Sequence, residues 1–513
     1  MENLDTECEP RQATATEIRT LPHVVDSVPF IVWVAVFAGA AERFTFYAVT
    51  IPWQNYIQNG HESIANPGAL GLGQATATKI NSAFYFLSFL TPIPFALVSD
   101  AWLGRYKTLI ICFFLNFCGC LVLFITSLPS VTRDTVKIAG LVVSMVLLGL
   151  GTGGVKATVS PFIGDQYTTM VPQLVVRKNG ESVIADRTLT LQYIYNVFYW
   201  FTNIGALSEI AATYLEKYVG FWAAYLLPLS SCWVSVPLLM LWGRSLVKLA
   251  PQGNVLPQAG KVIMYSARNR FRLDAAKPTF QAEKHRRMSC FVPFYLCLSQ
   301  ISNNLVSQAG QMRLGAIPND TVQVFNSIGC IILGPVIQKV LYPTLQKYKI
   351  AFKPIARMAF SFIAMSIAMG YVAGVQKLIY SRGPCYNRPL ACSASAGGSI
   401  SNDISVWVQV PVYFLLAIAE ILGLTTLSEY SYSEAPKDMR SVVQALRQVT
   451  SGVGSALAVA LAQFAKDPDI LYLYTGLAVT MILSAPTFWV AFKGYDKDKS
   501  ELDGDLHNQQ SHN

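Results

Sequence analysis

The sequence predicts an all-α membrane protein with about twelve spanning helices. Its 513 residues are 52% hydrophobic and only 13% charged, whereas soluble domains carry about 25% charged residues. The apolar residues gather in runs of roughly 20, the length that an α-helix needs to cross a bilayer. These runs lack the strict alternation of a barrel strand, so helices are the structure that pairs their backbone groups within lipid.

The order of the apolar runs predicts two similar halves. Twelve spans are expected near residues 28–50, 78–98, 107–127, 138–162, 189–213, 221–243, 289–311, 322–343, 355–376, 406–429, 441–464 and 469–492. The longest polar segment follows the sixth span. The predicted division is therefore a tail at 1–27, a six-helix bundle at 28–243, a linker at 244–288, a second six-helix bundle at 289–492 with a loop at 377–405, and a tail at 493–513.

The charge distribution predicts the orientation in the membrane. A net charge of +9 could indicate nucleic-acid binding. However, basic residues crowd between Arg244 and Arg287, directly after an apolar run, against only two acids, Asp274 and Glu283. This is the pattern of a cytoplasmic loop under the positive-inside rule. We therefore expect both termini in the cytoplasm, the loop 377–405 outside, and no nucleic-acid partner.

Cysteine and histidine positions limit the chemistry. Cys385 and Cys392 lie in a polar, Gly/Ser-rich loop predicted to be outside, where an oxidising environment suits a local disulfide. All histidines lie in polar segments: His23, His61, His285, His507 and His512. A membrane-embedded acyltransferase or hydrolase would need a catalytic base at membrane depth. We therefore expect no enzyme, no metal and no cofactor.

Ionisable side chains within apolar spans are costly and usually face a cavity or a partner. The chain places such groups at Glu42, Arg43, Lys156, Glu420 and Arg447. Charges of both signs in both halves suit a central cavity for a zwitterion, whose carboxylate would meet Arg43 and Lys156 and whose ammonium group would meet Glu420. The alternative is that they form interhelical ion pairs that only hold the bundle together.

Five segments together resemble the proton-dependent oligopeptide transporters, a branch of the major facilitator superfamily. The first is Ala41-Glu42-Arg43-Phe44-Thr45-Phe46-Tyr47, which is similar to that family's signature in its first span. The others are Ser99–Lys107 between spans 2 and 3, Gly151–Tyr167 in span 4, Phe198–Gly205 in span 5, and Glu420–Pro436 in and after span 10. The resemblance covers residues 28–492 in order and has the character of the fungal branch.

The resemblance implies the major facilitator fold and proton-coupled uptake of di- and tripeptides by alternating access. It assigns peptide binding to Arg43, Tyr47, Lys156, Asn203, Asn326 and Glu420. It assigns proton coupling to Glu42, Arg43 and Lys156, and a cytoplasmic gate to Asp100, Gly104, Arg105 and Lys107. A substrate carboxylate competing for Arg43 and Lys156 would favour proton uptake by Glu42. The implied partners are a short peptide, protons and the lipid bilayer, for a monomer in the plasma membrane.

Four positions depart from the family pattern, one of them Phe89, where relatives place a Tyr. Gly39 stands where a second glutamate is usual, Ser307 where some relatives have an acid, and Arg447 where relatives place Trp or Phe. Arg447 is either a cation of the binding pocket or the partner of Glu420 in an ion pair that closes the C-terminal half. These departures favour an alternative cargo: nitrate, another organic anion or a peptide-like secondary metabolite, imported or exported with altered proton coupling.

Overall fold

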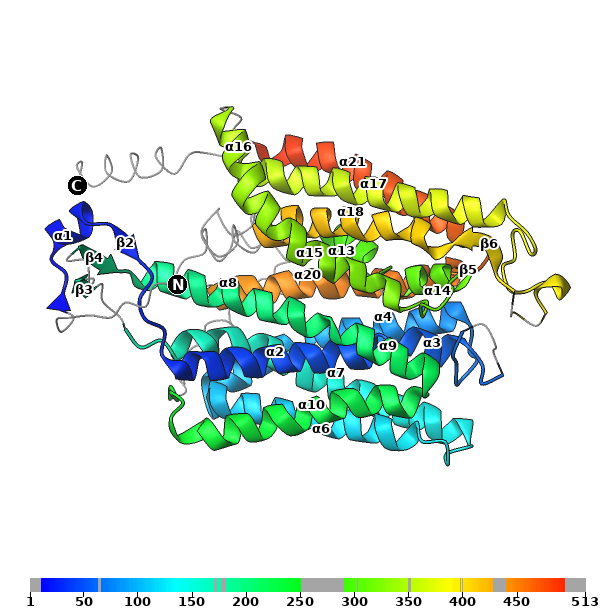
Figure 1. The fold of residues 1–513 in the computed structure, drawn as a ribbon, viewed down its shortest axis with the longest axis horizontal. Coiled ribbons are helices and arrows are strands. Elements are labelled where there is room, and N and C mark those ends of the chain that lie inside the picture. Colours follow the sequence, from blue (N-terminus) through cyan, green and yellow to red (C-terminus); the bar gives the residue numbers. More distant parts are fainter. Residues whose placement is uncertain are drawn as a thin grey trace, which may run out of the picture. The chain divides into compact units, whose positions relative to one another are not determined.

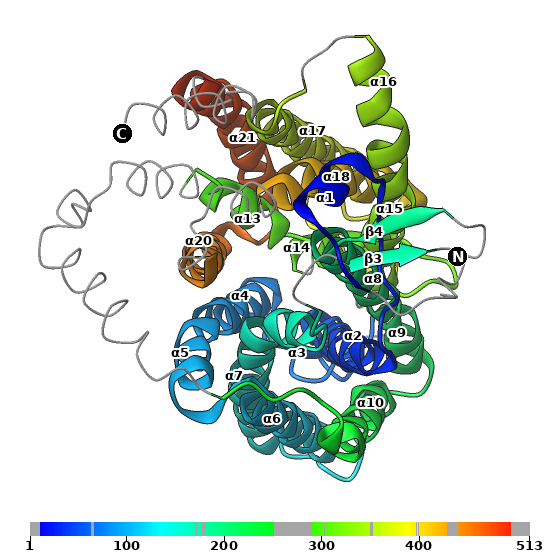
Figure 2. The ribbon, with the colours of Figure 1, turned by 90° about the vertical axis from the view of Figure 1, so that its left-hand side faces the viewer.

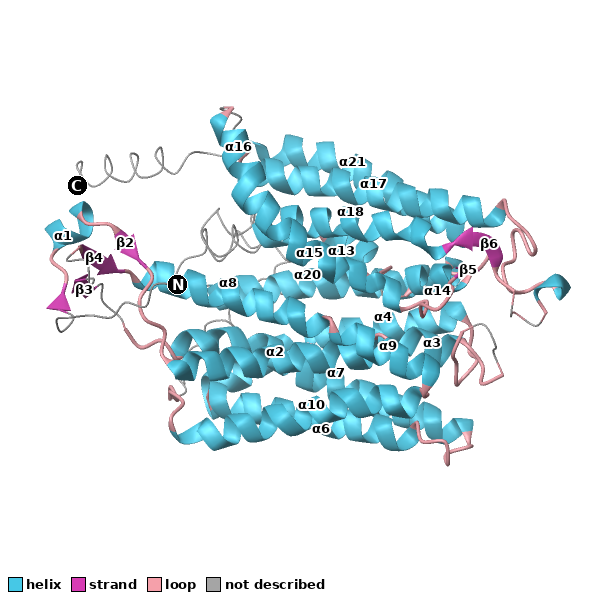
Figure 3. Cartoon of the chain, viewed as in Figure 1, coloured by secondary structure: helices cyan, strands magenta, loops and turns pink. Residues whose placement is uncertain are grey.

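The chain is mostly helical (Figure 3). The computed structural model describes residues 11–62, 66–169, 173–176, 181–250, 290–301, 303–348, 352–396, 398, 400–427 and 440–493. Eight of its helical stretches are long and apolar enough to cross a membrane, which confirms the predicted fold class. Each of the twelve predicted spans contains at least one helix, and the count of twelve crossings stays a prediction.

The chain forms two compact units. Unit 1 consists of residues 1–50 and 90–258, and unit 2 of residues 51–89 and 259–513. Residues 51–89 group with the C-terminal part of the chain, and the division into two six-helix bundles stays a prediction. Polar side chains of residues 51–89 are hydrogen-bonded to residues 303–319 of unit 2, as described below.

Unit 1 is a bundle of long helices with short breaks. Its helices are α2 (Phe30–Thr50), α5 (Pro92–Val98), α6 (Arg105–Thr126), α7 (Asp134–Asp165), α8 (Arg187–Ala206), α9 (Ser208–Tyr218) and α10 (Phe221–Leu241), with the π-helical turn η1 (Ser99–Leu103) and the 3₁₀ turn η2 (Trp242–Arg244). Helix α6 lies along α7, and α10 along α2 (Figures 1 and 2). At Gly151 of α7 a Cβ atom would lie 2.2 Å from Asn116 Oδ1 of α6, so the small residue permits this close packing.

A small sheet lies at one end of unit 1, beside the start of α8 (Figure 1). It is built from β1 (Arg11–Gln12), β2 (His23–Val24), β3 (Gln173–Val176) and β4 (Ser182–Ala185), with α1 (Ala15–Thr20) between the first two. The strand order is β1-β3-β4-β2, with β3 antiparallel to β4 and β2 parallel to β4. Part of the predicted N-terminal tail is therefore folded onto the loop between α7 and α8.

Unit 2 surrounds an aromatic core. Its helices are α3 (Trp53–Gln58), α4 (Gln74–Leu90), α13 (Val292–Leu298), α14 (Asn304–Gly310), α15 (Val324–Val336), α16 (Tyr342–Lys347), α17 (Pro354–Tyr380), α18 (Val410–Glu420), α20 (Arg440–Leu461) and α21 (Ile470–Phe492). The shorter turns are η4 (Thr321–Gln323), η5 (Ile337–Leu341), η6 (Ser393–Ser395), η7 (Val406–Gln409), η8 (Ile421–Thr425) and η10 (Ala462–Phe464), and the parallel strands β5 (Met312–Arg313) and β6 (Asn402–Ser405) pair. In the core, the ring of Phe362 lies 4.9 Å from that of Phe291 and 5.2 Å from that of Phe488.

Proline and glycine mark the helix boundaries. Proline lies in the first turn of α5, α13, α17 and α18, where its missing N–H costs no helical hydrogen bond. Gly104 has a φ of +77° between η1 and α6, a conformation that other residues rarely adopt. The chain can therefore turn sharply there and start α6 at Arg105.

Several sequence predictions concern residues outside the described ranges. These are most of the linker at 244–288, the tail after Lys493, and the end of the span-10 signature from Ser428 to Pro436, with Glu429 in it.

Candidate functional site

Glu42 and Arg43 form a buried ion pair within α2. The Arg43 Nε atom lies 2.7 Å from Glu42 Oε2, and a terminal nitrogen lies 2.5 Å from the same oxygen. The side chain of Glu42 is only 2% exposed, and its Oε1 atom accepts no hydrogen bond from the described residues. One oxygen of this buried carboxylate is therefore held by Arg43, and the other has no hydrogen-bond partner among the described residues.

The ring of Phe46 contacts a second cation, Lys156, as well as Arg43. The guanidinium carbon of Arg43 lies 4.9 Å from the centre of the Phe46 ring, and the Lys156 Nζ atom lies 5.1 Å from the same centre. Both distances are those of cation–π contacts. Tyr47 packs edge-on against Phe46 at 5.4 Å. The structure thus gathers two cations, from α2 and α7, around one aromatic ring beside Glu42.

Phe198 occupies the space that a larger residue would need at position 39. A Cβ atom on Gly39 would lie 2.7 Å from Phe198 Cε2 and 2.9 Å from Val159 Cγ2. A glutamate at this position would therefore require the ring of Phe198 to move. The close packing of α8 on α2 therefore requires a small residue at position 39, where the family pattern has a glutamate.

Asn203 lies on α8, one turn beyond Tyr199. Its Nδ2 atom donates a hydrogen bond of 2.8 Å to the Tyr199 carbonyl oxygen. Two residues later, a Cβ atom on Gly205 would lie 2.9 Å from the carbonyl oxygen of Ala40. This close approach holds the Asn203 segment beside α2, the helix that carries Glu42 and Arg43.

In unit 2, Glu420 is held by Asn326. The Asn326 Nδ2 atom of α15 donates a hydrogen bond of 2.9 Å to Glu420 Oε1. Glu420 is the last residue of α18, and the π-helical turn η8 follows it at once. Such turns interrupt the regular helix and are frequent at functional sites. The hydrogen bond shows that Asn326 and Glu420, the two peptide-binding candidates of the C-terminal half, contact each other directly.

Arg447 lies half-buried on α20. The same helix carries Ser451 and Ser455, which are buried. The two roles predicted for Arg447, a cation of the binding pocket and the ion-pair partner of Glu420, both stay predictions.

Ser307 lies in a buried cluster of uncharged polar side chains in unit 2. Its Oγ atom accepts a hydrogen bond of 3.1 Å from Gln54 Nε2 and donates one of 2.5 Å to Gln58 Oε1. Beside it, Asn55 and Asn319 exchange two hydrogen bonds of 2.8 Å each. An amide cluster thus joins α3 to α14 and the loop after it, and these contacts explain why residues 51–89 belong to unit 2.

The predicted gate motif forms a cluster of charges in unit 1. One Arg105 nitrogen lies 2.7 Å from each carboxylate oxygen of Asp165, at the end of α7. Another Arg105 nitrogen lies 3.6 Å from Asp100 Oδ1. Lys107 is exposed. Arg105 therefore connects the turn before α6 to α7, whereas Lys107 stays outside this cluster.

Cys385 and Cys392 form a disulfide, with 5.4 Å between their Cα atoms. It closes a short loop at the end of unit 2 that also carries β5 and β6. We call this end the disulfide end. Among the described residues, no group of three His, Cys, Asp or Glu side chains could hold a metal ion.

Comparison with known proteins identifies the family. The sequence profile of the POT family matches residues 106–291 and 286–483. A Schizosaccharomyces pombe protein called a probable peptide transporter is 38% identical over 514 residues, which cover 95% of this chain and 82% of the relative. The chain belongs to the POT family. A peptide transporter of Candidozyma auris is likewise 38% identical, over 96% of this chain and 89% of the relative.

Solved structures agree with this POT family fold. The crystal structure of the POT family transporter PepTSo superposes with a TM-score of 0.72 and covers 92% of this chain and 99% of that chain, at 18% identity. A POT family transporter in complex with 5-aminolevulinic acid gives a TM-score of 0.70, at 16% identity. These likenesses concern the fold alone.

Sequence analysis missed two parts of the site. Phe46 follows Arg43 by three residues on one helix, a spacing that places both on one face, so its contact with Arg43 could have been anticipated. The contact with Lys156 could not, because it depends on how α7 packs on α2. The amide cluster around Ser307 was missed for the same reason.

Proposed function

We propose that this POT family member carries short peptides across the plasma membrane by alternating access, coupled to protons. One arrangement carries the proposal: Arg43 and Lys156 share the ring of Phe46 beside the buried carboxylate of Glu42. The relatives named as peptide transporters support it. Two cations are a binding site for a substrate carboxylate, and Glu420 with Asn326 offers a negative site for an ammonium group.

Proton coupling follows from competition for Arg43. Arg43 donates a hydrogen bond to one oxygen of Glu42. A substrate carboxylate that binds Arg43 and Lys156 removes this compensation, and a buried carboxylate without it binds a proton more tightly. Protonated Glu42 then needs no cation, so peptide and proton bind together.

The orientation and the gate are part of the same proposal. Loop charges support a cytoplasmic position for both termini and an outside position for the disulfide, where an oxidising environment would preserve it. The charge cluster of Arg105, Asp100 and Asp165 would then lie at the cytoplasmic end. We propose that this gate opens when the ion pairs of Arg105 break. We further propose that a single chain is the transporting unit.

Uptake by purified protein in proteoliposomes tests the proposal. Labelled dialanine should accumulate only with an inward proton gradient, and Glu42→Gln should abolish accumulation while sparing exchange of labelled for unlabelled peptide. The Phe46→Leu variant is a matched control for Arg43 and Lys156, because it removes the shared ring and keeps both charges. Saturable nitrate uptake without any dialanine uptake would show that the cargo is a non-peptide anion.

A further inference from the structure

A chain of buried glutamines crosses the disulfide end of unit 2. Gln311 Nε2 donates a hydrogen bond of 2.8 Å to Asp467 Oδ2, and Gln376 Nε2 donates one of 2.8 Å to Gln311 Oε1. Gln308 Nε2 donates to Gln376 Oε1 at 2.8 Å, and Gln409 Nε2 donates to Gln308 Oε1 at 3.0 Å. All four glutamines are buried, and every link donates toward Asp467.

The chain connects four separate elements. Gln308 lies in α14 and Gln311 follows it, Gln376 lies in the last turns of α17, and Gln409 ends η7 at the start of α18. Asp467 lies in the loop before α21. A single file of amide groups thus runs from this loop to the helix that carries Glu420.

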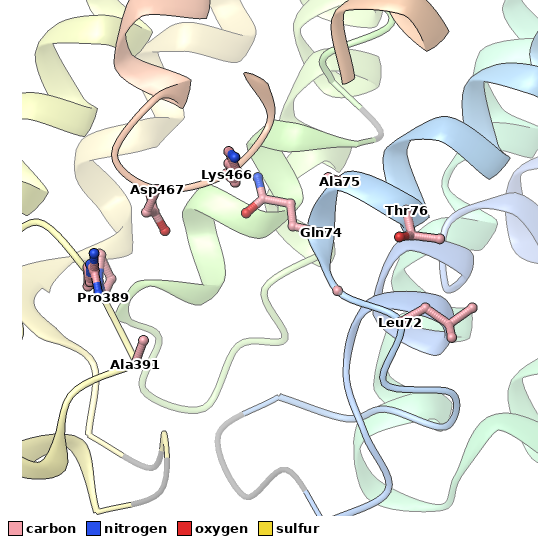
Figure 4. Close-up of a pocket in the computed structure, with 10 residues that line it drawn as sticks. Leu72, Gln74, Ala75, Thr76, Pro389, Ala391, Lys466 and Asp467 are labelled. Carbon is pink, nitrogen blue, oxygen red and sulfur yellow. The ribbon is translucent and has the colours of Figure 1, made fainter. Parts of the chain in front are cut away.

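Water can reach Asp467 at one end of the chain. The residue lines a pocket of about 510 Å³ together with Gln74, Arg388 and Lys466 (Figure 4). Burial raises the pKa of Asp467 to about 6, although the hydrogen bonds from Tyr380 and Gln311 lower it. The carboxyl group therefore changes charge near pH 6.

The charged and titratable groups around Asp467 do not neutralise it. Tyr380, at the end of α17, donates a hydrogen bond to Asp467 Oδ1, and Tyr474 of α21 also faces the carboxyl group. Lys466 is mostly exposed, with its Nζ atom 3.9 Å from Asp469, and Arg388 lines the pocket. Asp467 forms no ion pair among the described residues. The hydrogen bonds from Gln311 and Tyr380 are what stabilise its negative charge.

The direction of the chain fits an ionised Asp467, because both carboxylate oxygens accept hydrogen bonds. A proton bound at Oδ2, the oxygen that faces Gln311, would make Asp467 a donor there, and the Gln311 amide would then turn so that Oε1 faces it. Each following amide would then turn in the same sense. Gln409 can complete the reversal, because its Oε1 atom accepts no hydrogen bond from the described residues and could accept one from Gln308.

We propose that Asp467 is a proton-binding switch whose charge sets the direction of this glutamine chain and so alters the start of α18. Reversal releases two backbone contacts that the present direction makes. Gln409 Nε2 lies 2.9 Å from the Leu305 carbonyl oxygen, and Gln308 Nε2 lies 3.2 Å from that of Val372. Linked hydrogen bonds reinforce one another, so intermediate states with opposed links are disfavoured. The proposal needs no substrate and goes beyond the proposed peptide transport.

Infrared difference spectra of the purified protein between pH 5 and pH 7 test the first step. The wild type should show a protonated carboxyl C=O band with a midpoint near pH 6 that Asp467→Asn lacks. Tyr380→Phe removes a donor that favours the ionised form, so the midpoint should rise. The matched control is Asp403→Asn, an exposed acid paired with Arg313 at 2.9 Å, which should leave the band unchanged.

Hydrogen exchange tests the second step. After correction for its intrinsic pH dependence, the exchange of residues 404–413 should differ several-fold between pH 5 and pH 7 in the wild type. Asp467→Asn should abolish the difference. Gln376→Met, which breaks the chain in the middle at similar volume, should abolish it while retaining the carboxyl band.

Two results would overturn the proposal. One is a carboxyl band that persists in Asp467→Asn, since the proton would then bind elsewhere. The other is an exchange difference that survives Gln376→Met, since the signal would then bypass the glutamines. If either variant is too unstable to purify, Tyr380→Phe decides by the sign of its shift, because a midpoint that falls or stays contradicts the switch.

Discussion

One nitrogen of Arg105 lies 2.7 Å from each of the two carboxylate oxygens of Asp165. The contact connects the start of α6 to the end of α7. The contact joins segments 60 residues apart in the sequence. Its partners are partly exposed, at 31% and 14%, so its contribution to stability is moderated by solvent screening.

Replacing Arg105 by lysine should destabilise unit 1 by about 1–2 kcal/mol, because hydrogen bonds to charged groups contribute about 1.5–3 kcal/mol and exposure reduces this. The measurement is the midpoint of thermal unfolding in detergent. Lys107→Ala, on the same helix but exposed, should change it little. Equal midpoints for Arg105→Lys and the wild type would show that charge alone suffices there.

Gly39→Ala should destabilise the chain, because the new Cβ atom would lie 2.7 Å from Phe198 Cε2 and overpacking costs about 1–3 kcal/mol. Adding Phe198→Leu should recover most of the loss in the same unfolding measurement. Gly370→Ala is the control, because no atom lies within 4 Å of its added Cβ and alanine favours a helix by up to about 1 kcal/mol. If Gly39→Ala is as benign as Gly370→Ala, the packing of α8 on α2 is not limiting.

Glu420→Gln should raise the KM for dialanine by roughly 10- to 100-fold, the range that follows from losing a hydrogen bond to a charged group. The variant keeps the shape of the side chain and removes the charge that would attract an ammonium group. N-acetylated dialanine, which lacks that ammonium group, should be affected much less. An equal loss for both peptides would place Glu420 outside the ammonium site.

The sheet at the end of unit 1 should be more stable in acid. Nε2 of His23 lies 2.8 Å from the Ile18 carbonyl oxygen and Nδ1 lies 2.7 Å from Asp186 Oδ2, and these contacts raise the pKa of His23. A raised pKa stabilises the fold at pH below the ordinary histidine value, and the benefit is lost as pH rises through the folded-state value.

Hydrogen exchange of β3 and β4, corrected for its intrinsic pH dependence, should therefore be slower at pH 6 than at pH 8. His23→Gln should remove this difference, and His61→Gln, an exposed histidine in unit 2, should retain it. An unchanged profile in His23→Gln would mean that another group titrates there.

Hydropathy was sufficient to locate the helices, because each long apolar run has one favourable structure in lipid. It did not locate their breaks. The predicted first span continues past Thr50 into α3, and the predicted seventh is divided into α13 and α14. These interruptions depend on tertiary hydrogen bonds, such as those of Gln54 and Asn304, which no local pattern records.

The candidate site was predictable where one helix carries neighbouring groups. Glu42 with Arg43 is such a case, and their contact needs only the local sequence. The family resemblance assigned Asn326 and Glu420 to peptide binding, but their hydrogen bond joins α15 and α18 and was not predicted. The glutamine chain was not predicted, because it joins residues of α14, α17 and η7, which only the tertiary packing brings together.

The sheet order β1-β3-β4-β2 has a practical consequence for fusion proteins. Both outer strands come from residues 11–24, so a truncation that begins the chain at α2 would strip both edges from the β3–β4 hairpin. A lone two-stranded hairpin is marginal in water, and its open edges invite pairing with other chains. A purification tag is therefore better joined ahead of an intact N-terminus than grafted in its place.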